Sequence, residues 1–164
     1  MSELEFISHG EEQTEAIGRA IGLASRAGDV VGLVGELGAG KTRLIKGVAA
    51  ALGVNNRQQV RSPTFVLIRE HAGRLRLFHV DAYRLHGAWE LNSLGFEEIL
   101  SQGGLTVVEW ADQVADGLPV DRLTLHLVIT GLRSRQVSLR CGGGRSRALL
   151  ERLREEWAKM GQEE

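Results

Sequence analysis

The stretch that decides the fold is GLVGELGAGKTRLIKG, residues 32–47. Within it, residues 35–42 match the P-loop pattern G-x-x-x-x-G-K-[ST]. In a P-loop, successive backbone N–H groups surround phosphate oxygens, and glycine is needed because the backbone takes unusual dihedral angles and approaches the phosphate closely. The pattern therefore predicts a nucleotide-binding loop. The residues expected to bind the cofactor there are Gly35, Gly38, Ala39, Gly40, Lys41, Thr42 and Arg43.

The flanking sequence predicts the strand and the helix that a P-loop requires. Residues 29–34, DVVGLV, form the short apolar run that is typical of a strand buried on both faces. Residues 41–52 carry apolar side chains at helical spacing, and Gly53 supplies a C-terminal stop. Phosphate would then lie at the N-terminus of this helix, where unpaired N–H groups and the helix dipole favour an anion.

Two side chains of the loop add chemistry that the backbone cannot supply. The Lys41 ammonium would reach the β- and γ-phosphates as a point charge, so we expect it to act in catalysis, and the Thr42 hydroxyl would ligate magnesium. The alternative is a glycine-rich turn that binds nothing. The strand before the loop and the helix after it favour nucleotide binding.

Length and composition indicate one ordinary domain. We expect a single domain over residues 1–164, and the formal net charge of −1 excludes a generally basic nucleic-acid binder. The single cysteine, Cys141, permits neither an internal disulfide bond nor a cysteine-based zinc site. Since no segment is apolar enough for a membrane span and the first residues carry charges, we expect a soluble cytoplasmic protein with no membrane partner.

The remaining sequence alternates between helical and strand patterns. Ser8 to Glu11 reads as a capping box before a first helix that Gly28 would end. The further expected elements are a hairpin over residues 64–71 and 74–80, short helices within 88–100 broken near Gly95, a strand over 105–109, a hairpin over 122–130 and 135–140, and a helix over 146–160. This order predicts an α/β, three-layer P-loop NTPase fold with a mixed, mainly parallel central sheet and antiparallel hairpins.

Two acidic residues end apolar strands and are candidates for the other half of the site. Asp81 follows LFHV and Glu109 follows LTVV. Ligands of open α/β sheets bind at the carboxyl ends of strands, and phosphoryl transfer needs acidic groups for magnesium and for the nucleophile. The alternatives are a turn aspartate and a surface carboxylate. The sequence leaves open which of the two lies closer to magnesium.

Other polar residues have weaker support. Thr64 follows Ser62-Pro63, and its hydroxyl could contact a γ-phosphate or a magnesium-bound water, although a plain strand start explains it equally well. His79 and Tyr83 flank Asp81 and could orient it. Arg61, Arg84 and Arg133 could neutralise charge in the transition state, but in a chain with so many arginines a solvated surface charge explains any one of them better.

Four segments, in this order, resemble one family: GELGAGKT, SPTF, HVDAYR and VEW. They are similar to the bacterial TsaE (formerly YjeE) ATPases, and the resemblance extends from Ser8 to about Arg140. The sequence departs from the family pattern at Glu36, where aspartate is usual, and at Ala111-Asp112, where Pro-Glu is common.

The resemblance implies an ATPase that works with the TsaB and TsaD proteins in forming threonylcarbamoyladenosine next to the anticodon of tRNAs that read ANN codons, with tRNA contacted indirectly. It implies ATP and Mg²⁺ as cofactors. Thr42 and Glu109 would ligate the metal, Asp81 would serve catalysis, and Gly38 to Thr42 would hold the phosphates. Glu11 and Arg133 would lie near the nucleotide.

Two other functions stay open at this stage. A small-molecule kinase shares the P-loop and the fold class, but it usually needs an arginine-bearing lid, and no long arginine-rich insertion is evident. A nucleotide-sensing switch would bind a partner without catalytic purpose. For such a switch adenine is favoured over guanine, because no lysine stands in an N-K-x-D setting.

Overall fold

The computed structural model describes residues 3–54 and 67–162. The predictions for Arg61, Ser62, Pro63 and Thr64 lie outside the described residues. The elements are β1 (Leu4–Ser8), α1 (Glu11–Ala24), β2 (Val30–Gly35), α2 (Lys41–Ala51), β3 (Ile68–His71), β4 (Leu77–Asp81), α3 (Ala88–Ser93), α4 (Phe96–Ser101), β5 (Leu105–Glu109), the 3₁₀ helix η2 (Ala111–Gly117), β6 (Leu123–Ile129), β7 (Arg135–Cys141) and α5 (Gly144–Gln162).

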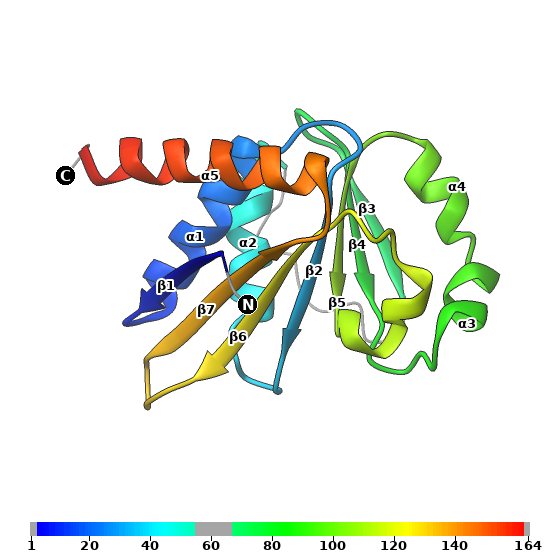
Figure 1. Cartoon of the computed structure of the whole chain (residues 1–164), viewed down its shortest axis with the longest axis horizontal. Coiled ribbons are helices and arrows are strands. Elements are labelled where there is room, and N and C mark those ends of the chain that lie inside the picture. The colour runs from blue at the N-terminus through cyan, green and yellow to red at the C-terminus, as the bar shows by residue number, and fades with distance from the viewer. Residues whose placement is uncertain (1–2, 55–66, 163–164) are drawn as a thin grey trace.

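In the described part of the chain, seven strands form one sheet in the order β1-β7-β6-β2-β5-β4-β3 (Figure 1). The four central strands, β6, β2, β5 and β4, run parallel. At the two edges β1, β7 and β3 pair antiparallel with their neighbours. The predicted mixed sheet, parallel in its centre and with antiparallel hairpins, is therefore confirmed.

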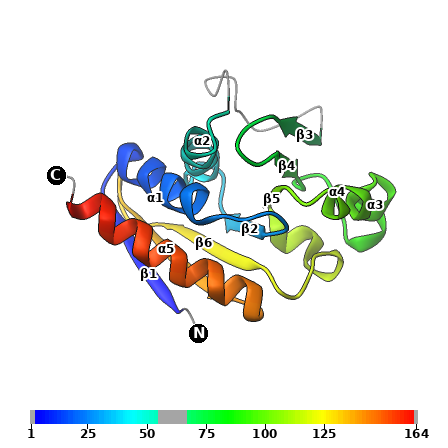
Figure 2. The same ribbon diagram turned by 90° about the horizontal axis from the view of Figure 1, so that it is seen from above.

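Helices cover the sheet unequally. One apolar cluster packs α1, α2 and α5 against one face, and a second cluster packs α3, α4 and η2 against the other face beside β4 and β5. The two groups of helices lie apart, with β2, β5 and β4 between them (Figure 2). Strands β4 and β5 are buried on both faces. On β1 and β6 the second face is open, and Ile7 and Val128 are exposed there. This arrangement is the three-layer fold that the alternation of elements predicts.

Helices α1 and α2 approach each other backbone to backbone. A Cβ on Gly18 of α1 would lie 1.9 Å from the Leu44 carbonyl oxygen, and one on Gly47 of α2 would lie 2.0 Å from the Glu15 carbonyl oxygen. Since no side chain fits at either position, the two glycines permit the crossing. The crossing fixes the axis of α2, and thereby the place where the P-loop ends.

The predicted stop of α2 is also confirmed. Gly53 has a φ of +71°, its N–H donates to the Ala50 carbonyl, and the N–H of Val54 donates to the Ala49 carbonyl. This is the Schellman arrangement, in which a left-handed residue satisfies the last carbonyls of a helix. Gly95 breaks α3 from α4 in the same left-handed region, as the sequence predicts.

The prediction for the N-terminal segment is wrong in two respects. Ser8 is the last residue of β1, and the first helix begins at Glu11 with Gly10 as its N-cap and no side-chain cap. The Ser8 hydroxyl instead bonds to that of Thr14, because β1 runs antiparallel to β7 and turns Ser8 toward the helix. The helix ends at Ala24, so Gly28 forms a separate turn before β2. The 3₁₀ helix η2 is a further element that the sequence pattern does not predict.

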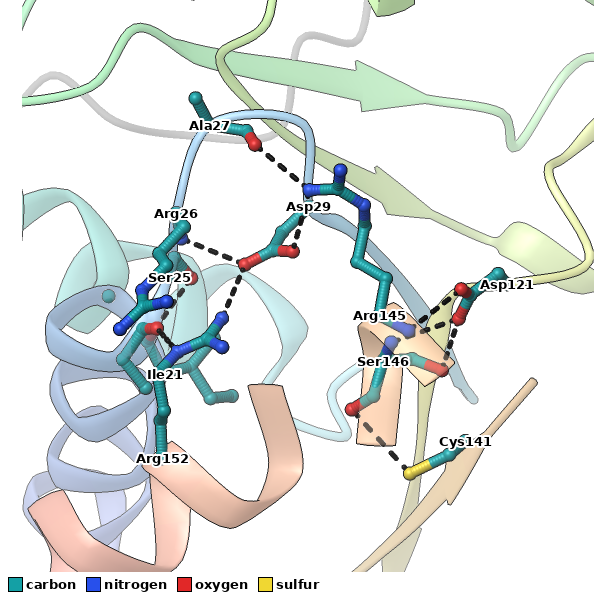
Figure 3. A network of polar contacts seen from close by, with 12 residues as sticks. Ile21, Ser25, Arg26, Ala27, Asp29, Asp121, Cys141, Arg145, Ser146 and Arg152 are labelled. Atoms are coloured by element: carbon teal, nitrogen blue, oxygen red, sulfur yellow. Dashed lines mark hydrogen bonds and ion pairs between the residues drawn. The ribbon is translucent and has the colours of Figure 1, made fainter. Parts of the chain in front are cut away.

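Carboxylates at the amino edge, where the parallel strands begin, attach α5 to the sheet (Figure 3). Asp29, immediately before β2, is 2% exposed. Its carboxylate accepts hydrogen bonds from the Arg26 N–H at 2.8 Å and the Arg152 guanidinium at 3.1 Å, and Arg145 lies 3.7 Å away. Arg145 and Arg152 belong to α5, so this one acid joins the end of the α1–β2 connection to the last helix.

Two more acids at the same edge complete the attachment. Asp121, just before β6, accepts hydrogen bonds from the Ser146 N–H at 2.9 Å and from its hydroxyl at 2.7 Å. Glu3 accepts one from the Cys141 N–H at 2.6 Å and forms an ion pair with Arg147.

Among the described helices, none is both long and apolar enough to cross a bilayer.

Candidate active site

The P-loop leaves β2 at the carboxyl edge of the sheet and enters α2 directly. Gly38 and Gly40 have φ values of +83° and +104°, in the left-handed region that favours glycine. A Cβ on Gly35 would lie 2.7 Å from the Leu127 carbonyl oxygen of β6. The glycines of the motif are thus needed for loop geometry and for contact with the neighbouring strand. Gly40 is the N-cap of α2 and provides no side chain to cap the first N–H groups.

The Lys41 side chain is folded into this loop and is only 5% exposed. Its ammonium donates hydrogen bonds to the carbonyl oxygens of Gly35 and, at 3.2 Å, Glu36, and it lies 3.5 Å from the centre of the Trp110 ring. Burial lowers the pKa of Lys41, while the negative charges of nearby Glu109, Asp112 and Asp81 act to raise it. The ammonium is therefore held close to the acidic groups of the strand ends.

The two predicted carboxylates lie side by side. Asp81 ends β4 and Glu109 ends β5, and these residues are direct partners in the parallel register. Glu109 is in turn paired with Leu33 of β2, two residues before the P-loop begins. Asp81 is 5% exposed and Glu109 is 2% exposed. The predicted positions of both acids, at the carboxyl edge beside the loop, are therefore confirmed.

Each carboxylate is held by a different group. Asp81 Oδ1 accepts a hydrogen bond from the Tyr83 backbone N–H at 3.0 Å. Glu109 Oε2 lies 2.6 Å from Nε2 of His79, whose side chain is completely buried. The sequence predicts that His79 could orient its neighbour Asp81, whereas the structure places the imidazole against Glu109.

Trp110, which follows Glu109, lies over the Lys41 ammonium. Trp110 has a φ of +58°, and it is the only non-glycine residue with a positive φ among those the structure describes. Its ring packs on the Lys41 ammonium and on the Tyr83 ring, whose centre is 4.9 Å away. An aromatic residue in the left-handed conformation is strained, and such strain is typical of functional sites. Nothing in the local sequence marks this conformation.

A cleft of about 720 Å³ opens on the other side of the loop. Its walls come from the start of α1, the P-loop and the tip of the β6–β7 hairpin, and its lining includes Glu11, Gly38, Gly40, Arg43 and Arg133. The structure thus brings together the loop and the two residues that the family resemblance placed near the nucleotide.

Ion pairs order the walls of this cleft. The guanidinium of Arg43 lies 2.9 Å from the Glu15 carboxylate and 3.8 Å from that of Glu11. Arg135, which sequence reasoning missed, donates a hydrogen bond of 3.1 Å to the Gly38 carbonyl and so ties the hairpin to the P-loop. Its position follows from the pairing of β6 with β2, and no local motif reveals that pairing.

The remaining predicted residues have less definite surroundings. Thr42 lies half-buried in the first turn of α2, where a P-loop hydroxyl is required, and Ala39 is buried in the loop. Arg84 is exposed after β4. Thr64 lies outside the described residues.

The residues of the carboxyl edge fit a magnesium ion that also binds phosphate. No group of three or more His, Cys, Asp or Glu side chains suited to a metal occurs in residues 3–54 and 67–162. Magnesium usually binds one or two carboxylates, several waters and substrate phosphates, and does not need an all-protein cage. Oxygen donors from Asp81, Glu109 and Thr42 match that preference.

Comparison with known proteins agrees with the motifs. Residues 8–137 match the family model described as threonylcarbamoyl adenosine biosynthesis protein TsaE. The chain belongs to the TsaE family. Two proteins named tRNA threonylcarbamoyladenosine biosynthesis protein TsaE are similar to it: that of Bacillus subtilis is 36% identical over 93% of this chain and 95% of its own, and that of Treponema pallidum is 35% identical over 81% and 97%.

A solved structure extends the similarity to the fold. The crystal structure of YdiB from Bacillus subtilis superposes on this TsaE-family chain with a TM-score of 0.82. The two chains are 33% identical, and the alignment covers 94% of this chain and 97% of YdiB. The similarity therefore extends over nearly the whole of both chains and is not confined to the P-loop core.

Proposed function

We propose that this TsaE-family chain binds ATP with Mg²⁺ and hydrolyses it in the formation of threonylcarbamoyladenosine next to the anticodon of tRNAs that read ANN codons. The observation that carries the proposal is the meeting of three features at one edge of the sheet. These are the P-loop after β2, the buried Lys41 ammonium, and the paired carboxylates of Asp81 and Glu109.

The backbone and Lys41 would bind the phosphates. The N–H groups at the start of α2 and the left-handed glycines of the loop suit a triphosphate, because they direct partial positive charge at one point. The Lys41 ammonium, now bonded to loop carbonyls, would exchange these neutral acceptors for charged phosphate oxygens, which are stronger partners. Arg43 and Arg133 line the adjoining cleft, where the rest of the nucleotide would bind.

Glu109 and Asp81 would have different roles. Thr42 and Glu109 would hold Mg²⁺, which neutralises charge on the phosphates when bound. Asp81 would orient the attacking water and accept its proton, and the Tyr83 N–H that bonds its Oδ1 would keep the carboxylate directed at the site. Thr64 remains a candidate for contact with the γ-phosphate.

Activity would depend on TsaB and TsaD, with tRNA contacted through them. Support comes from the mouth of the site, where large apolar side chains are exposed: Leu37 of the P-loop, Leu132 of the β6–β7 hairpin and Tyr83 beside Asp81. Exposed apolar groups rimmed by arginines are typical of a surface that a protein partner covers. A docked partner would exclude water and could complete the site.

The experiment is to measure ATP hydrolysis by the chain alone, with each partner, and with both. We expect slow Mg²⁺-dependent hydrolysis that TsaB and TsaD together accelerate, together with partner-dependent tRNA modification that the Asp81→Asn variant abolishes. Phosphorylation of a metabolite would instead indicate a kinase. Full tRNA modification by Asp81→Asn with intact ATP binding would indicate a switch.

A further inference from the structure

We propose that His79 is a positioning residue for Glu109: its imidazole N–H fixes the Glu109 carboxylate in the orientation that receives Mg²⁺. The inference rests on the proposed function, since it concerns how the metal ligand is prepared. The sequence leaves open whether Asp81 or Glu109 lies closer to magnesium, and a fixed orientation of the carboxylate before the metal binds favours Glu109.

The geometry couples the two side chains tightly. His79 Nε2 and Glu109 Oε2 are 2.6 Å apart, and the two residues are 0% and 2% exposed. In the parallel register His79 pairs with Val107 and Asp81 pairs with Glu109, so His79 lies diagonally across from Glu109 on the neighbouring strand. Because paired residues share a face of the sheet, the imidazole and both acids lie on one side.

The chemistry of this contact indicates which ring nitrogen of His79 carries a hydrogen. An ionised carboxylate only accepts hydrogen bonds, so His79 must carry a hydrogen on Nε2 for this contact to be a hydrogen bond. His79 Nδ1 is buried and has no hydrogen-bond partner among the described residues. The neutral Nε2–H tautomer leaves only an acceptor lone pair at Nδ1, whereas the other tautomer would leave an N–H without a partner and place no donor on Glu109.

The hydrogen bond leaves the carboxylate able to bind a cation. It uses one acceptor position of Oε2, and a carboxylate offers about four such positions over its two oxygens. A hydrogen bond from a neighbouring imidazole orients a metal-binding carboxylate before the metal arrives, and loss of such a partner typically lowers metal affinity about 10–100-fold. Asp81 differs, because its identified donor is the Tyr83 backbone N–H, which every substitution except proline retains.

Two substitutions of His79 test the inference. His79→Leu removes the donor and keeps a buried side chain of similar size, whereas His79→Gln keeps an N–H at the position of Nε2. His71→Leu is the matched control, because it removes a partly buried imidazole from β3 that lies near His79 and has no identified bond to Glu109. For each protein, the affinity for a fluorescent ADP derivative is titrated against Mg²⁺ and also measured with EDTA.

We expect His79→Leu to raise the Mg²⁺ midpoint about 10–100-fold and to leave the metal-free affinity for ADP unchanged. His79→Gln should restore most of the midpoint, and His71→Leu should leave it at the wild-type value. An unchanged midpoint in His79→Leu would overturn the inference. So would an equal shift in His71→Leu, or an equal loss of metal-free affinity, because each points to general damage to packing.

These measurements also distinguish a failure of the proposed function from a failure of the role of His79. If the wild-type chain bound no nucleotide in the presence of Mg²⁺, the proposed function would fail, and the inference with it. If His79→Leu does not fold, His79→Gln and the ¹⁵N shifts of the wild-type ring decide the matter. A midpoint near wild type in His79→Gln and hydrogen on Nε2 support the inference, whereas hydrogen on Nδ1 alone contradicts it.

Discussion

The two edges of the sheet both contain buried acids, but they hold them in different ways. At the amino edge, Asp29 is bonded by the guanidinium of Arg152 and approached by that of Arg145, both fixed on α5 (Figure 3). At the carboxyl edge, Asp81 and Glu109 are adjacent and are contacted by a backbone N–H and an imidazole. The cation near them, Lys41, is bonded to carbonyl groups of its own loop.

This difference indicates two uses of a buried carboxylate. An acid paired with permanent cations of the same chain contributes to stability, because breaking a buried pair leaves a charge without compensation. Two acids placed next to each other repel, and a divalent cation or a proton relieves that repulsion. We therefore propose that the acids of the amino edge serve stability and that those of the carboxyl edge receive an exchangeable ligand.

The largest expected effect is that of Asp81→Asn on turnover. Loss of the base should lower the partner-stimulated ATPase rate about 10²–10⁴-fold. Nucleotide affinity should stay at the wild-type value, because the amide keeps the oxygen that accepts the Tyr83 N–H. Steady-state hydrolysis and ADP titration measure the two quantities, with exposed Asp116→Asn as the control. Normal hydrolysis by Asp81→Asn would remove this residue from the mechanism.

At the opposite edge, Asp29→Ala should act on stability alone. Removing this buried acid should lower the free energy of unfolding by about 3 kcal/mol, since Arg152 loses its partner. Urea denaturation measures the change, and Glu151→Ala, which removes an exposed pair with Arg154, should change stability by less than about 1 kcal/mol. A purely structural role for Asp29 would be contradicted if the Asp29→Ala protein were as stable as wild type, or if the folded variant lost affinity for nucleotide.

Lys41→Ala should weaken nucleotide binding about 10–100-fold, as expected for loss of hydrogen bonds from a charged group to phosphate. Lys46→Ala, on the same helix but outside the P-loop, should bind as the wild type does. Equilibrium titration with ADP and with an ATP analogue gives both affinities. Equal binding by Lys41→Ala and Lys46→Ala would mean that the ammonium does not contact phosphate.

The smallest expected effect is the acid sensitivity of the amino edge. The Cys141 N–H, chiefly, and the Arg147 guanidinium lower the pKa of Glu3 from 4.5 to about 2. Because the folded pKa lies below the unfolded one, the contribution of Glu3 to stability is complete above pH 4.5 and is lost as pH falls toward 2. Stability measured across this range should therefore fall less steeply in Glu3→Gln. Parallel curves for the two proteins would contradict the role of Glu3.

Local patterns predicted most of the fold. The buried runs at 29–34 and 105–109, the hairpin over 122–130 and 135–140 and the terminal amphipathic helix lie where periodicity indicates, because the burial of their apolar residues agrees with their intrinsic preferences. The described part of the first hairpin, β3 and β4, agrees as well. Ser8 is an exception. A capping box and a strand end share the same residue type, and only the pairing of β1 with β7, more than 120 residues later in the chain, decides between them.

The candidate site was predictable to the extent that it depends on strand ends. Asp81 and Glu109 could be found because acids that follow buried parallel strands must collect at one edge. The bond from His79 to Glu109, the contact of Arg135 with Gly38 and the left-handed Trp110 depend on the order of strands and on side-chain packing. No short motif specifies either of these.

The most direct test of the account is a crystal structure of the chain with Mg²⁺ and a non-hydrolysable ATP analogue. The account predicts phosphates on the N–H groups of residues 38–42, the Lys41 ammonium moved from the loop carbonyls to phosphate, and Mg²⁺ bound between the phosphates and the Asp81–Glu109 pair. Phosphates bound away from the loop, or a metal ion remote from both carboxylates, would contradict it.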